Sequence, residues 1–199
     1  MKLKIRIALI LVVFACAAFA SARAGTGASA AHLTYLPDGR VVFPTKYREW
    51  PYLSSGLDMT YALGGMAMDH HMFDNVFVDP DSLRAFEATG TWPEGTVFVR
   101  EDRAGATKGS INRAGQFQTA ELMGLELHVK DAARFKGGWA FFFFGSNDPA
   151  HPIPENAACY KCHGAHGAVD TTFVQFYPTL IGIAKSKKTL SANYLRDER

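Results

Sequence analysis

Cys159-Tyr160-Lys161-Cys162-His163 is the stretch on which the rest of the chain depends. Two thiols three residues apart, with a histidine directly after the second, form the attachment pattern of a c-type haem. Residues at i, i+3 and i+4 share one face of a helix, so both sulfurs can reach one edge of a porphyrin. His163 can then offer an imidazole nitrogen to the iron as the proximal ligand. The motif predicts one haem c per chain, attached through Cys159 and Cys162 and ligated by His163.

Two other sites use a similar cysteine pair. A redox dithiol or half of a zinc site also places two residues between its cysteines, and His166 would complete a zinc quartet with Cys159, Cys162 and His163. The adjacent Cys162-His163 pair would strain tetrahedral zinc, however. A thioredoxin-type dithiol needs a strand that leads into the helix and a βαβ frame, whereas residues 151–156 contain two prolines and have the composition of a loop. Haem attachment is therefore the preferred interpretation.

The start of the chain has the pattern of a secretory signal peptide. Three basic residues within the first six precede an apolar run over residues 7–20, and Ser21-Ala22-Arg23-Ala24 supplies small residues in A-x-A spacing. An uncleaved anchor is the alternative, but the run is shorter than the about 20 residues that span a bilayer. We expect cleavage after Ala24 or Ala20.

This leader implies a signal peptide over residues 1–24, a single haem domain over residues 25–199 and a periplasmic location. Because bacteria attach c-type haem outside the cytoplasm, the leader and the cysteine motif agree. Of the three cysteines, Cys16 leaves with the leader, so the mature chain keeps only the two of the motif.

The charge of the mature chain bears on its partners. The leader contains four of the 21 basic residues and none of the 19 acidic ones, so the mature net charge is −2. This balance argues against nucleic acid or an anionic membrane as a partner.

Hydrophobic patterning predicts an α+β fold, mainly an antiparallel β-sheet with short helices and a C-terminal haem-attachment helix. Asp79 has the position of a helix N-cap, with Pro80 at the first helical position and Gly90 past the end. Residues 101–113 are polar and glycine-rich and are expected to form a loop, and residues 185–199 are expected to fray. Residues 173–180 are expected to cover the haem. The expected strands are residues 33–36, 41–43, 75–78, 96–100, 116–129 and 139–144, the last buried on both faces.

Methionines and histidines gather between residues 57 and 73 and could supply a sixth ligand to the iron. Methionine is also an adaptable core residue, so this cluster has a purely structural interpretation. The candidates are Met59, Met66, Met68, His70, His71 and Met72.

The mature chain resembles the cytochrome P-460 family, including its cytochrome c′-beta branch. The late cysteine motif contributes to this resemblance, and the other matching segments occur in family order. They are Tyr47-Arg48-Glu49-Trp50, Val76-Phe77-Val78-Asp79-Pro80, Gly95-Thr96-Val97, Gly124-Leu125-Glu126, Val129-Lys130-Asp131 with Arg134-Phe135, Gly138-Trp139-Ala140-Phe141 and Phe176-Tyr177-Pro178.

The resemblance implies a mostly antiparallel β fold, a homodimer, and a haem with His163 on one side and an open or weakly occupied distal side. Family members bind nitric oxide, and the namesake branch oxidises hydroxylamine with a lysine joined covalently to the porphyrin. Arg100 occupies the expected lysine position here. Because a guanidinium stays protonated and is a poor nucleophile, we predict no cross-link there, which counts against enzymatic turnover. Lys108 is the nearest lysine downstream.

Glu126 corresponds to the acidic residue that the family uses as a distal base. It interrupts a hydrophobic strand, on the face opposite Leu125 and Leu127, where a buried carboxylate would have a raised pKa. The alternative is a carboxylate on a solvated sheet face, paired with Arg100 or His128. If Arg100 and Glu126 both line the pocket, their ion pair weakens the base, and Arg100 can instead donate a hydrogen bond to a bound ligand.

Two functions follow. The first is a periplasmic mono-haem protein with accessible iron that binds nitric oxide and oxidises hydroxylamine or transforms small nitrogen oxides, with a redox cytochrome as electron partner. The alternative is a six-coordinate electron-transfer cytochrome c without catalysis.

Overall fold

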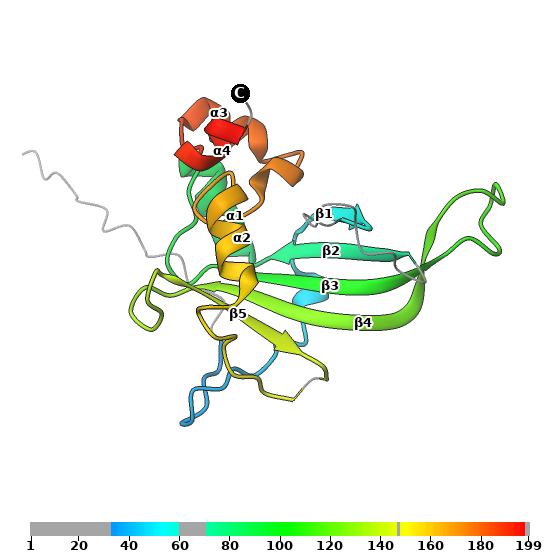
Figure 1. Ribbon diagram of the computed structural model, residues 1–199, viewed down its shortest axis with the longest axis horizontal. Coiled ribbons are helices and arrows are strands. Elements are labelled where there is room, and N and C mark those ends of the chain that lie inside the picture. Colours follow the sequence, from blue (N-terminus) through cyan, green and yellow to red (C-terminus); the bar gives the residue numbers. More distant parts are fainter. Residues whose placement is uncertain (1–32, 60–70, 147, 198–199) are drawn as a thin grey trace, which may run out of the picture.

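In the described part of the chain, five strands form one antiparallel sheet whose strand order follows the order of the chain (Figure 1). The structure, a computed structural model, describes residues 33–59, 71–146 and 148–197, so the leader expected over residues 1–24 lies outside the described residues. The strands are β1 (Tyr52–Leu57), β2 (Met72–Val78), β3 (Val97–Ala106), β4 (Phe117–Lys130) and β5 (Trp139–Phe144). The predicted fold class is confirmed.

Most of the short helices gather at one end of the molecule, and the β3–β4 hairpin extends from the opposite end (Figure 1). Within the described ranges, none of the helices has the length and apolar run needed to cross a membrane. The helices are η1 (Tyr47–Glu49), α1 (Pro80–Thr89), α2 (Ala158–His166), η2 (Val174–Phe176), α3 (Ile181–Lys187) and α4 (Ala192–Asp197).

Helix α1 begins and ends as the sequence predicts. The Asp79 carboxylate accepts a hydrogen bond from the backbone N–H of Ser82 at 2.8 Å, and Pro80 opens the helix. Gly90 ends it in the left-handed conformation, at φ 78°. The second Asp79 oxygen accepts from the Val97 N–H at 2.9 Å, so this buried residue also holds the start of β3 against the helix.

Three of the expected strand and loop assignments are wrong. Residues 101–113 do not form one loop, because β3 continues to Ala106 and its residues in the first half of this stretch pair with β4. Residues 33–36 and 41–43 form only isolated bridges, Tyr35 with Val41 and Val41 with Ala150, because this segment contributes side chains to a core rather than backbone to the sheet.

Strand β5 is less buried than predicted. Its first four residues and Phe144 are buried, but Phe143 is 52% exposed. The reason is that α2 packs against Phe141 through Tyr160 and His163, and Phe143, the next residue on that face, lies past this contact.

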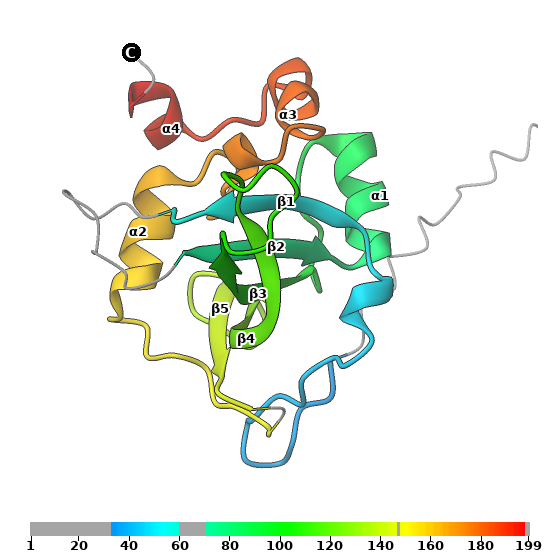
Figure 2. The same ribbon diagram turned by 90° about the vertical axis from the view of Figure 1, so that its right-hand side faces the viewer.

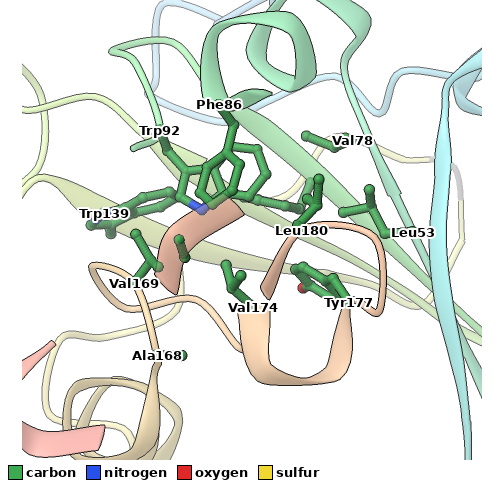
Figure 3. Close-up of a cluster of buried hydrophobic side chains, with 12 residues drawn as sticks. Leu53, Val78, Phe86, Trp92, Trp139, Ala168, Val169, Val174, Tyr177 and Leu180 are labelled. Carbon is green, nitrogen blue, oxygen red and sulfur yellow. The ribbon is translucent and has the colours of Figure 1, made fainter. Parts of the chain in front are cut away.

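The larger of two hydrophobic cores fills the space between the sheet and the helices (Figure 3). Trp92 stacks at 4.1 Å on Phe86 of α1 and meets Phe98 of β3 edge-on at 4.7 Å. Its indole N–H donates to the Thr172 hydroxyl at 2.9 Å, which ties the segment after α2 to the sheet. The core comprises Leu53, Val78, Phe86, Trp92, Phe98, Trp139, Ala168, Val169, Val174, Tyr177, Leu180 and Ala184.

The second core lies on the other face of β3, β4 and β5, where the N-terminal segment covers it. Alternation along each strand sends one set of side chains to this core and the next set to the helices, so both faces of the sheet are buried. It comprises Val41, Phe43, Tyr47, Val97, Val99, Leu125, Leu127, Val129, Ala140, Phe142 and Phe144.

The C-terminal residues 185–197 are helical in part, contrary to the predicted fraying. Helix α4 packs beside α2 at the top of the molecule (Figure 2). Asn193 donates to the Gly164 carbonyl at 2.8 Å, and the Ser191 hydroxyl donates to the Gly167 carbonyl at 2.7 Å. Carbonyls at the end of α2 that have no intrahelical donor thus find partners, which orders the tail.

We predict that Asp79→Ala lowers the free energy of unfolding by about 2–4 kcal/mol, because it removes a helix cap and leaves the buried Val97 N–H without an acceptor. Asp79→Asn keeps one acceptor and should lose less than half as much. Denaturant unfolding of the purified protein measures both. A loss below about 0.5 kcal/mol for the alanine variant would contradict this role.

Candidate functional site

Helix α2 presents the motif side chains on one face. Cys159, Cys162 and His163 all line the same cavity, and both cysteines are free thiols and partly buried. The helix follows an extended loop after β5, and its N-cap Ala157 provides no side-chain cap. The prediction that the motif lies on a helix, with its three chemically active residues facing one way, is confirmed.

His163 is held by one hydrogen bond from its inner nitrogen. Nδ1 lies 2.7 Å from the carbonyl oxygen of Thr171, which can only accept, so Nδ1 carries the proton and Nε2 keeps its lone pair. Burial, reinforced by the positive charge of Arg100, lowers the pKa of His163 to about 4. The imidazole is therefore neutral at physiological pH, which is the state that binds a metal.

The turn after α2 brings the Thr171 carbonyl to His163. Gly167 lies at the point of closest approach, where an added Cβ would stand 2.7 Å from the His163 carbonyl oxygen and 2.9 Å from the Thr172 nitrogen. No side chain fits there without moving the backbone. Glycine at this position thus allows the chain to fold back against the end of the helix.

Aromatic rings from the sheet and the tail surround the His163 imidazole. Its ring centroid lies 4.6 Å from that of Phe141 on β5, 5.0 Å from that of His128 on β4, and 4.2 Å from that of Phe173. His128 itself stacks on Phe141 at 4.1 Å, and its Nε2 lies 3.3 Å from the Thr171 hydroxyl. Burial lowers the pKa of His128 well below its usual value, so this second imidazole is also neutral.

The cavity in front of these residues has a volume of about 600 Å³. Its walls are mostly apolar near α2 and become charged toward the other end of the sheet face. Beyond the three motif residues, the lining comes from residues after and within β1, from β2, β3, β4 and β5, and from the segment after α2. These residues are Ser54, Gly56, Leu57, Asp58, Met59, Asp74, Val76, Phe98, Arg100, Glu126, Leu127, His128, Phe141, Thr172, Phe173, Phe176 and Tyr177.

A cluster of one arginine and three carboxylates forms the charged end. Arg100 donates two hydrogen bonds to Asp102, at 2.7 and 2.8 Å, and a third to Glu126 at 3.2 Å. Asp74 completes the cluster at 3.6 Å from the guanidinium. Strand register explains the arrangement, because Arg100 pairs across the sheet with Glu126, and Asp74 pairs with Asp102.

Burial changes the protonation of these carboxylates. Burial raises the pKa of Asp74 to about 7, because the attraction of Arg100 does not offset desolvation and the repulsion from the nearby Asp102 and Glu126. Burial also raises the pKa of Glu126, again against the opposing effect of Arg100. One Asp74 oxygen, Oδ1, is buried without a hydrogen-bond partner. The cluster therefore combines a fixed cation with Asp74, whose pKa of about 7 allows it to exchange a proton near neutral pH.

The structure brings all five predicted site residues to one cavity. Arg100 and Glu126 line it together with the motif residues, and they form the ion pair considered above. Glu126 thus pairs with Arg100 and also lines the cavity, and its role as a base stays a prediction.

The other ligand candidates are placed less uniformly. Met59 lines the cavity, whereas His71 pairs with Asp58 at 2.5 Å and Met72 lies in β2. Met66, Met68 and His70 lie outside the described residues.

Sequence reasoning missed Asp74, Asp102, Thr171 and His128 as parts of the site. The polar pattern predicts a loop at Asp102, although strand alternation from Arg100 places both side chains on one face. For His128 the sequence suggests only a possible partner of Glu126. Thr171 acts through its backbone carbonyl, for which the sequence carries no signal.

The competing zinc and dithiol interpretations find no support in this geometry. His166 Nδ1 lies 3.1 Å from Asp197 on α4. Among the described residues, no three histidine, cysteine or carboxylate side chains are grouped as metal ligands. Helix α2 follows an antiparallel strand rather than standing in a βαβ unit.

Two comparisons bear on the relatives of the chain. The family model for cytochrome P460 matches residues 44–174, which is well over half of the sequence and ends just after the cysteine motif. A search of curated proteins found none that matches.

We predict that Asp74→Asn stabilises the protein above neutral pH. Because the pKa of Asp74 is raised on folding, wild-type stability from this group is present below about pH 4 and is lost as the pH rises through about 7. Asparagine avoids that loss, so the variant should gain about 1 kcal/mol near pH 8 and little near pH 4. Thermal unfolding across this range measures the difference, with the exposed Asp148→Asn as control. A gain independent of pH would contradict the assignment.

Proposed function

Since the chain belongs to the cytochrome P460 family, we propose that it is a periplasmic c-type cytochrome with an accessible iron that binds nitric oxide. The observation that carries the proposal is a single cavity that joins Cys159, Cys162 and His163 at one end to Arg100 and Glu126 at the other. The leader supports the periplasmic location, and the family resemblance supports a homodimer.

Family membership implies a haem cofactor, and the residues present fit one. The helix supplies two free thiols and a neutral imidazole on one face, which is the donor set of c-type attachment. A cavity of about 600 Å³ with aromatic and aliphatic walls stands in front of them. Cys159 and Cys162 would hold the group by thioether bonds, and His163 would be the proximal iron ligand.

The surroundings of His163 would orient that ligand. The Thr171 carbonyl fixes the proton on Nδ1 and the direction of the ring, and the rings of Phe141 and Phe173 restrict its rotation. Such an outer hydrogen bond raises the basicity of a coordinating histidine. When bound, the haem supplies a redox-active iron that takes small nitrogen ligands.

Glu126 and Arg100 provide two different functions at the charged end. Burial gives Glu126 a pKa closer to neutrality, so it can accept a proton from an N–H or O–H group placed in the cavity. Arg100 stays protonated and can donate a hydrogen bond to a ligand. Because the two residues are paired at 3.2 Å, proton acceptance by Glu126 competes with its ion pair.

Nitric oxide binding is better supported than hydroxylamine oxidation. No lysine occurs among the cavity-lining residues in the described part of the chain, and Arg100 stands where the family's cross-linking lysine was expected. Lys108 is exposed in the turn between β3 and β4 and does not line the cavity. We therefore propose a haem without a lysine cross-link, with hydroxylamine oxidation as a secondary activity that would need a redox cytochrome as electron acceptor.

Met59 favours a second candidate, a six-coordinate electron-transfer cytochrome. Its side chain lines the same cavity, and a thioether is a common sixth haem ligand in electron carriers. Optical spectra separate the two functions. A high-spin ferric protein whose spectrum changes with nitric oxide supports the first, and a low-spin protein unaffected by it supports the carrier.

We predict that protein made in haem-competent cells has an intact mass equal to the mature polypeptide plus one haem. Cys159→Ser and Cys162→Ser together should remove covalent haem, because no other cysteine remains in the mature chain. His166→Ala on the same helix is the matched control and should keep it. Wild-type protein at the mass of the bare polypeptide would overturn the proposal.

We predict that Glu126→Ala reduces any hydroxylamine-dependent reduction of an electron acceptor by about 10²–10⁴-fold, the usual contribution of a general base. Nitric oxide binding should persist, because that ligand delivers no proton. Glu121→Ala, an exposed position on the same strand, serves as control. Unchanged turnover in the Glu126 variant would exclude this residue from proton transfer.

A further inference from the structure

We propose that the charged end of the cavity selects ligands by charge, admitting small neutral molecules and disfavouring anions. The inference rests on the proposed function, since it concerns what reaches the iron in that cavity. The admitted ligands are neutral N–H or O–H compounds of the hydroxylamine type and uncharged nitric oxide, and the disfavoured ligands are anions such as azide and nitrite.

Negative charge exceeds positive charge where the cavity is polar. Asp74 and Glu126 line the cavity. Asp102 is paired with Arg100 at 2.7 Å, and the Asp102 side chain is almost fully buried. Asp58 also lines the cavity and is paired with His71. Arg100 is the sole arginine or lysine among the lining residues that the structure describes. An anion brought here meets more like charge than opposite charge.

Arg100 has few donors left for an incoming anion. Its Nε and Nη2 donate to the two oxygens of Asp102, and Nη1 donates to Glu126. A guanidinium carries five N–H groups, and three of them are committed to these carboxylates. The Nη2 atom also lies 3.6 Å from Asp74 Oδ1. An anion would have to replace one of these contacts, and the displaced carboxylate would lose its counter-ion.

The carboxylates offer acceptors instead. The Asp74 Oδ1 atom is buried without a hydrogen-bond partner, although a buried polar atom normally has one. A ligand that carries N–H or O–H groups can donate to the carboxylates of Asp74 and Glu126, which line the cavity. Azide and nitrite carry no such proton at neutral pH, so they cannot.

Strand β4 leaves room for the Arg100 cluster. Gly124 on β4 pairs with Asp102, and a Cβ there would lie 3.3 Å from Asp102 Oδ2 and 3.4 Å from the Phe143 ring. Glycine therefore leaves room for Asp102 to engage Arg100 with both oxygens. The arrangement extends over β2, β3 and β4 and does not depend on one loop.

Ligand titrations of the ferric holoprotein test the inference. Affinities for sodium azide and for nitric oxide are measured at constant ionic strength near pH 8, where Asp74 is charged. The variants are Asp74→Asn, Glu126→Gln and Arg100→Gln, and the control is Glu87→Gln on the exposed side of α1. The midpoint potential of each protein is recorded as a second readout.

We expect Asp74→Asn and Glu126→Gln each to strengthen azide binding about tenfold, and Arg100→Gln to weaken it, while nitric oxide affinity changes little. The midpoint potential should rise in the two carboxylate variants, because removing nearby negative charge disfavours ferric iron, and it should not move in the control.

Two results would overturn the inference in distinguishable ways. Nitric oxide binding with azide affinity and potential unchanged in all three pocket variants would refute charge selection and leave the proposed function intact. No nitric oxide binding by the wild-type holoprotein would refute the proposed function and the inference together. A variant that does not fold is replaced by Asp102→Asn, for which the same increase in azide affinity is expected.

Discussion

The antiparallel register between β3 and β4 is the constraint on which the site depends. It places Phe98 opposite His128 and Arg100 opposite Glu126, all on the face that α2 and the following segment cover. A slip of one residue would exchange the two faces, sending these polar groups into the opposite core and the valines and leucines of that core into the cavity. Burial of the two hydrophobic cores therefore determines the strand register, and the register determines which functional side chains lie together in the cavity.

Different interactions position the side chains at the two ends of the cavity. Near α2, packing dominates: His163 lies among aromatic rings, and its one hydrogen bond goes to a backbone carbonyl that a glycine-dependent turn delivers. Toward the other end, electrostatics dominates, because Arg100 is surrounded by carboxylates and burial raises the pKa of Asp74 and Glu126. The first region would hold a haem rigidly, and the second would act on whatever binds beyond it.

A second buried carboxylate, Glu101, differs from those of the cavity in how its charge is compensated. Glu101, next to Arg100 but on the opposite face, accepts hydrogen bonds from Tyr47, Arg48 and Arg103 and has a lowered pKa despite its burial. Asp74 Oδ1 has no hydrogen-bond donor, and its ion pair with Arg100 is longer, at 3.6 Å. Burial therefore raises the pKa of Asp74, whereas the donors around Glu101 lower the pKa of that carboxylate.

The cysteine motif, the α1 caps and the alternating end of β4 can be predicted from local sequence, because each depends on neighbours a few residues away. The family resemblance also predicts Arg100 and Glu126 as pocket residues. Tertiary structure alone decided that β3 runs through the polar stretch after Arg100, that Asp74 and Asp102 complete the cluster, and that Thr171 orients His163. These features arise from cross-strand pairing and from a backbone carbonyl, and neither leaves a local pattern in the sequence. The paired residues lie far apart in the chain, and burial of the whole sheet provides the free energy that brings them together.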